Sequence, residues 1–150
     1  MMKSLLCAAA GSLILGAGSA NAEPYVDYTP QPGVWQITAM EVDPNHVDEY
    51  LGGLRKSQLP SMEVLKKRGL IDTYKIVVRT GYVKGSPNVL IMTHAASFAK
   101  LDPDKARDQA VSKEMESIFS KDKEKAAVSG YEKIRTFVDD ALWTDVTLLP

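Results

Sequence analysis

Residues 81–87 join two strand-like runs and are too few to form a helix that crosses a sheet. The runs on either side, residues 70–80 and residues 88–98, are both rich in β-branched residues. Parallel neighbouring strands need a crossover connection of roughly a dozen or more residues, so this short connection restricts the two runs to an antiparallel hairpin. The chain must therefore build at least part of an antiparallel sheet.

Segments before the hairpin add a strand and a long helix. Residues 34–42 are rich in β-formers and stop at Asp43-Pro44-Asn45, which is typical of a turn. Residues 47–68 have the apolar spacing of a helix, with acidic residues in the first turn and basic residues in the last. Pro60 predicts a kink in this helix. The pair Gly52-Gly53 would leave bare helix backbone that a ligand could approach closely.

Segments after the hairpin add a split helical region and a last strand. A first helix is predicted from one apolar stripe, and a second from Ala127, Tyr131, Ile134 and Val138. Residues 141–149 then read as the final strand. The resulting order, β-α-β-β-α-β, predicts an α+β fold of the ferredoxin-like type, with a four-stranded antiparallel sheet and its helices on one face.

The second face of this predicted sheet has a mixed composition. By alternation, one side of the strands carries apolar residues, namely Tyr74, Ile76 and Val78 in one strand and Leu142, Val146 and Leu148 in the last. The other side carries Lys75, Val77, Arg79, Trp143, Asp145 and Thr147. Such a face is neither plainly a solvent surface nor plainly a core.

Over residues 34–149 the chain resembles the dimeric α+β-barrel proteins, which include antibiotic-biosynthesis monooxygenase-like, haem-degrading and NIPSNAP-like domains. The resemblance is carried by the strand end Val42-Asp43-Pro44-Asn45, the long helix with Tyr50 and Pro60, the Lys67-Arg68-Gly69-Leu70-Ile71 entry to the second strand, and Leu142-Trp143. In that family two sheets pack by their second faces into a barrel. The resemblance therefore implies a homodimer and accounts for the mixed second face.

The N-terminal residues predict export. Residues 1–22 have one positive charge, an apolar run and the triplet Ala20-Asn21-Ala22, which is the layout of a cleavable signal peptide. Cleavage after Ala22 would leave a periplasmic or secreted protein without cysteine, because Cys7 lies in the signal. Residues 23–33 are rich in proline and predict an extended arm, and residues 34–150 form the α+β domain.

The charge of the mature chain disfavours some partners. Without Lys3 it has 17 basic and 19 acidic residues, and no block of five like charges. We therefore expect neither nucleic acid nor an anionic membrane as the main partner. Stable insertion into a membrane is not expected either, because no apolar run reaches the roughly 20 residues of a spanning helix.

Several side chains on the predicted strands could bind or transform a small molecule. His94 is the best candidate for a catalytic base, because an unperturbed imidazole titrates near pH 6.5, and Arg79 could serve as its donor. A lone histidine on a strand is, however, more often a hydrogen-bonded structural residue. A ligand site could be lined by Trp35, Tyr74, Lys75, Trp143 and Asp145.

Two classes of function follow. The first is a non-enzymatic dimer that binds a small apolar or aromatic ligand between sheet and helices. The second is a cofactor-independent monooxygenase or isomerase that uses His94. Through the resemblance, haem binding or degradation is a minor third possibility, although neither His94 nor His46 matches the helical position of the haem ligand in haem-degrading relatives. No cofactor and no metal site is otherwise expected, since the sequence contains no Cys-x-x-Cys, His-Glu-x-x-His, Gly-x-Ser-x-Gly or phosphate-binding loop.

Overall fold

The computed structural model describes residues 21–150, the side chain of Glu124 excepted. The predicted signal peptide lies almost wholly outside the described residues and stays a prediction. The chain is α+β, and the described residues form three α-helices, two short 3-10 turns and antiparallel strands in two sheets. The elements are β1 (Tyr28–Pro30), β2 (Val34–Val42), α1 (Val47–Lys67), β3 (Thr73–Val78), β4 (Val89–Ala95), α2 (Lys105–Ile118), α3 (Lys121–Tyr131), β5 (Arg135–Trp143) and β6 (Val146–Leu148).

The main sheet has four antiparallel strands in the order β3-β4-β2-β5. This architecture is compatible with a ferredoxin-like fold. The predicted hairpin is confirmed, because β3 and β4 pair antiparallel from Thr73 opposite His94 to Val78 opposite Val89. β2 spans the residues expected from the sequence and lies in the middle of the sheet, where its alternating β-formers pair with strands on both sides.

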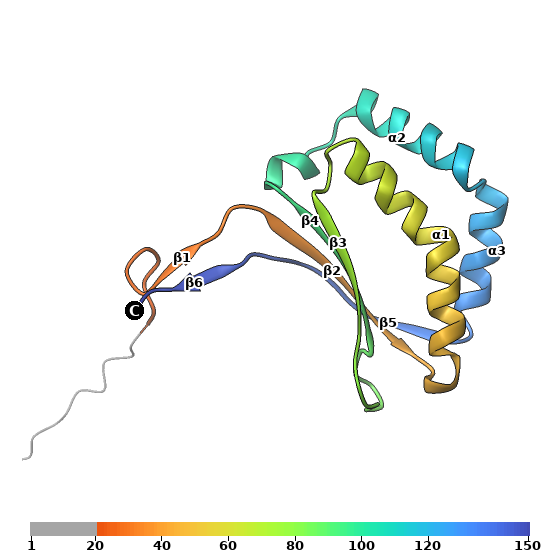
Figure 1. The fold of residues 1–150 in the computed structure, drawn as a ribbon, viewed down its shortest axis with the longest axis horizontal. Coiled ribbons are helices and arrows are strands. Elements are labelled where there is room, and N and C mark those ends of the chain that lie inside the picture. Colours follow the sequence, from red (N-terminus) through yellow and green to blue (C-terminus); the bar gives the residue numbers. More distant parts are fainter. Residues whose placement is uncertain (1–20) are drawn as a thin grey trace, which may run out of the picture.

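The three α-helices lie on one side of this sheet, and within residues 21–150 no helix lies on its other side (Figure 1). The core lies under α1, where the fully buried Tyr50 and Met62 meet Val42 and Val89 from the sheet. Tyr74 and Ile76 pack against this core as alternation predicts, whereas Val78 at the end of β3 is exposed. Burial of this one sheet face is what holds the helices in place.

Helix α1 ends and bends where the sequence indicates. Asp48 and Glu49 occupy its first turn, Lys66 and Lys67 its last, and Gly69 follows with a φ of 65° that a residue with a side chain rarely adopts. The helix changes direction near its middle (Figure 1). Pro60 lies inside it, and its missing N–H leaves one carbonyl of the preceding turn without its helical donor.

The prediction for residues 132–140 was wrong. The spacing of Ile134 and Val138 after Tyr131 suggested a continuing helix, but α3 ends at Tyr131 and β5 begins at Arg135. Pairing with β2 explains the difference, because residues from Arg135 to Trp143 form a ladder along nearly the whole of that strand. A ladder on a central strand outweighs the weak helical preference of Thr136, Phe137 and Val138.

The predicted final strand is split into two. β5 ends at Trp143, and after Thr144 and Asp145 the short β6 pairs antiparallel with β1 in a separate two-stranded sheet. This small sheet joins the two ends of the described chain and projects away from the helices (Figure 1). Leu142, Val146 and Leu148, expected on a buried side of the last strand, are therefore all exposed.

Candidate functional site

A pocket of about 450 Å³ lies between the sheet and the three helices. A volume of this size is in the range of small-molecule sites. Its apolar wall is made by Met40, Leu54, Ile91, Met115, Phe119, Ala127 and Val128, and its polar wall by Thr38, Ser57, Gln58, Ser61, Ser112, Glu116, Lys121, Tyr131 and Arg135. The pocket therefore has a mixed lining, in which apolar side chains stand beside a comparable number of polar ones.

Arg135 and Tyr131 line one end of this pocket, and both contact the buried Tyr50. Arg135 is the first residue of β5, and its guanidinium donates a hydrogen bond of 3.0 Å to the Tyr50 hydroxyl. The same guanidinium lies 5.7 Å from the ring centre of Tyr50 and 5.3 Å from that of Tyr131. The two rings meet edge to face at 5.2 Å. These contacts fix the position of a cation beside the cavity.

Position 53 needs a glycine because a side chain there would clash with Tyr131 in the pocket wall, and not because a ligand approaches the backbone. A Cβ atom at position 53 would lie only 1.9 Å from the Tyr131 hydroxyl oxygen, whereas one at Gly52 would meet nothing within 4 Å. The sequence interpretation that this glycine pair exposes backbone to a ligand is therefore replaced. Gly53 lets the ring of Tyr131, which lines the pocket, pack directly against α1.

Other polar groups on the wall are already engaged. The Ser57 and Ser61 hydroxyls donate to carbonyls of the preceding turn of α1, at Gly53 and Ser57. Glu116 and Lys121 form an ion pair of 2.8 Å where α2 meets α3. Their charges compensate each other, so this part of the wall adds little net charge.

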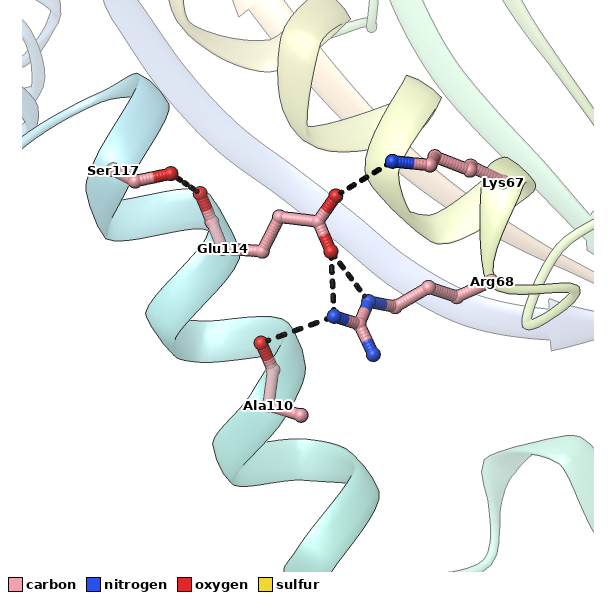
Figure 2. Close-up of polar contacts among 5 residues, drawn as sticks. All are labelled: Lys67, Arg68, Ala110, Glu114 and Ser117. Carbon is pink, nitrogen blue, oxygen red and sulfur yellow. Dashed lines mark hydrogen bonds and ion pairs between the residues drawn. The ribbon is translucent and has the colours of Figure 1, made fainter.

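An ion-pair cluster fastens α2, which forms one wall, to the end of α1 (Figure 2). The Glu114 carboxylate accepts from Arg68 Nε at 2.7 Å and from Lys67 Nζ at 3.3 Å. Arg68 also donates to the Ala110 carbonyl at 3.5 Å. The hydrogen bond from Arg68 holds the pKa of the Glu114 carboxyl below its ordinary value, so this carboxyl stays charged at neutral pH.

Four of the residues singled out in the sequence meet at the open face of the sheet. Trp35 lies opposite His94 in the β2–β4 ladder, and their rings are 4.8 Å apart. Lys75 Nζ lies 5.0 Å from the ring centre of Trp35, and the indole N–H donates to Asp145 at 3.1 Å. This group and the helix-covered pocket lie on opposite sides of the sheet.

His94 is held by its neighbours on two sides. Its Nδ1 lies 2.7 Å from Asp72 Oδ1, an arrangement that can orient an imidazole. Its Nε2 faces Gly33, since a Cβ atom built on that glycine would lie 2.4 Å from it. The close approach of the Gly33 backbone narrows access to the nitrogen that a base would use.

Of the remaining predicted residues, Arg79 and Tyr74 do not join this group, whereas Trp143 lies beside it. Arg79 follows the end of β3, and from Thr73, which pairs with His94, that is roughly 20 Å along an extended strand. Tyr74 points to the helix side and donates to Glu63, which raises the pKa of its hydroxyl. Trp143, the last residue of β5, pairs with Trp35, and its side chain is 55 % exposed.

The residues that form the pocket end were not found from the sequence. Tyr131 was expected in a helix and is there, but Arg135 was placed inside that helix and so could not be assigned to a sheet-side wall. The signal that could have located it is the run Arg135-Thr136-Phe137-Val138, whose β-forming residues compete with the helical spacing.

No protein-family model, curated protein or solved structure matches this chain. Within residues 21–150, no group of three or more histidine, cysteine, aspartate or glutamate side chains is placed to hold a metal ion. In the same range, no helix is both long and apolar enough to cross a bilayer.

Proposed function

We propose that the mature protein is an exported homodimer of the dimeric α+β-barrel type that binds a small apolar or aromatic ligand in the pocket between sheet and helices. The pocket of about 450 Å³, with an apolar wall beside its polar groups, is the observation that carries this proposal. The proposal assigns no cofactor to the site. Its oligomeric part is supported separately by the open face of the sheet.

A ligand that fills the pocket should stabilise the folded chain. With 2-naphthol or decan-1-ol at a hundred times its dissociation constant, mass action adds about 2.7 kcal/mol to the free energy of unfolding, a rise of several degrees in Tm. Ala127→Trp places a bulky ring on the pocket wall and is expected to abolish this shift. Differential scanning fluorimetry with the two compounds measures it.

Ala126→Trp is the matched control, because Ala126 precedes Ala127 on α3 but is exposed and does not line the pocket. It should retain the full thermal shift. An equal loss of binding in both variants, or no shift for the unaltered protein with either compound, would refute the pocket as the binding site.

The open face of the sheet supports a dimer. Alternation along β2 and β4 places Trp35, Ile37, Ala39, Leu90 and Met92 on this side, and Val77 on β3 is 43 % exposed there. Among the described residues no helix covers these side chains. An apolar sheet face of this kind is typically buried by a second layer, and a second copy of the same face would supply it.

Ile37→Glu is expected to convert the dimer to a monomer. Ile37 lies between Met92 and Ala141 in the ladders, and two copies of a glutamate here would place charge inside the interface. Burying such a charge without a partner weakens association by at least about a hundredfold. Sedimentation velocity should show this loss, while Ala126→Glu, which adds the same charge at an exposed helix position, stays dimeric. A monomeric unaltered protein at micromolar concentration would contradict the proposal.

A second candidate function is a cofactor-independent monooxygenase or isomerase with His94 as base. The 2.7 Å contact between Asp72 and His94 favours it, because a carboxylate at Nδ1 can orient the imidazole and fix its tautomer. His94→Gln separates the two candidates. It should leave ligand binding in the helix-side pocket unchanged, whereas loss of that binding would support a role for the open face.

A further inference from the structure

The cation at the end of the pocket, Arg135, has no anionic partner among the residues that the structure describes. Arg135 bonds the neutral Tyr50 hydroxyl and lies near two aromatic rings, and among the described residues no carboxylate forms an ion pair with it. A guanidinium has five N–H donors, and here one bond to a side chain accounts for a single donor. The remaining donors are available to another acceptor.

The other charges of the pocket do not compensate Arg135. Glu116 and Lys121, the two other charged residues of its lining, pair with each other. Asp140 lies on the same strand, but it accepts hydrogen bonds from Gln36 and Thr38, away from the Arg135 end. The lining as a whole therefore carries one excess positive charge beside an apolar cavity.

We propose that the ligand is an amphipathic anion, an aliphatic or aromatic carboxylate whose charged group binds Arg135 and whose apolar body lies against Met115, Phe119 and Val128. This inference rests on the proposed function, because it names the chemical class of the ligand of the same pocket. The planar guanidinium fork matches a carboxylate in two-pronged geometry, which a neutral alcohol cannot reproduce.

The position of Arg135 strengthens the interaction. Its side chain is only partly exposed, so an ion pair formed there is screened less than one on the open surface. The edge-to-face contact of Tyr50 and Tyr131 keeps the guanidinium in place before any ligand binds, which reduces the ordering cost of binding.

Decanoate and decan-1-ol test the inference, because they share an alkyl chain and differ in the charged group. By isothermal titration calorimetry with the mature chain at neutral pH, decanoate should bind roughly tenfold to a hundredfold more tightly than decan-1-ol, which is the range expected for a hydrogen bond to a charged group. Arg135→Gln should abolish this preference and leave the affinity for decan-1-ol within about twofold.

Two further variants control for charge and for folding. Arg135→Lys keeps the positive charge and should therefore keep part of the preference for decanoate over decan-1-ol. If substitution at this position merely unfolded the chain, no preference would remain. Arg79→Gln removes an arginine that follows β3 and lies outside the pocket lining. This variant should keep the whole preference for decanoate.

The outcomes separate the two proposals. Equal affinities of decanoate and decan-1-ol for the unaltered protein, or an unchanged preference in Arg135→Gln, would overturn the anionic ligand while leaving the apolar pocket intact. Failure of both compounds to bind would overturn the proposed function itself.

Discussion

Asn88→Ala should lower the free energy of unfolding by about 3 kcal/mol, because two buried backbone groups would lose their partners at once. The Asn88 side chain accepts from the N–H of Val42 and donates to the carbonyl of Val42, each at 2.7 Å. Asn88 is 5 % exposed and Val42 is fully buried, so water cannot replace the lost bonds. Urea denaturation followed by circular dichroism measures the change.

The reason for this large effect lies in the sheet. The β2–β4 ladder ends with Met40 opposite Val89, two residues before Val42. The amide of Asn88 continues the ladder as a substitute peptide group and holds the end of β2 under α1. Asn45→Ala, at an exposed asparagine, should change stability by less than about 1 kcal/mol. Equal effects of the two substitutions would show that the paired amide contributes nothing specific.

Gly53→Ala and Gly52→Ala are expected to have opposite signs although the residues are neighbours. Alanine at Gly52 meets no atom within 4 Å and should stabilise α1 by up to about 1 kcal/mol. Alanine at Gly53 would displace the ring of Tyr131, and repacking of this kind costs about 1–3 kcal/mol. Thermal and urea unfolding of the two single variants gives both values.

The same substitution also tests the wall of the pocket. Displacement of Tyr131 would disturb Arg135, so Gly53→Ala should weaken binding of decanoate as well as stability. In a Tyr131→Ala background the clash is gone, and adding Gly53→Ala should then be neutral or stabilising. Additive effects of the two substitutions would contradict direct packing of the ring on the glycine.

The first half of the fold is encoded locally and could be predicted. Residues 34–42 alternate as a strand, the connection over residues 81–87 is too short for a crossover, and charges and Gly69 mark the ends of α1. Each of these signals acts over a few residues. The structure agrees with them because no long-range pairing opposes them.

The second half depends on pairing between distant segments. Ile134 and Val138 fit a helix by spacing, yet the ladder of β5 with β2, about a hundred residues away in sequence, makes this segment a strand. The same error explains why the end of the pocket was missed. Because Arg135 was assigned to a helix, it was not considered as part of the sheet side of the pocket, where it lies. The two faces of β3 could be assigned by alternation, and Lys75 does lie on the same side of the sheet as Trp35 and His94.

Mapping of backbone amide chemical shifts during a titration with decanoate tests the central claim most directly, because it reports where the ligand binds. The account predicts that the largest shifts fall on residues lining the helix-side pocket, around Met115, Val128 and Arg135. Shifts confined to the open face, around Trp35 and His94, or no saturable shifts at all, would contradict it.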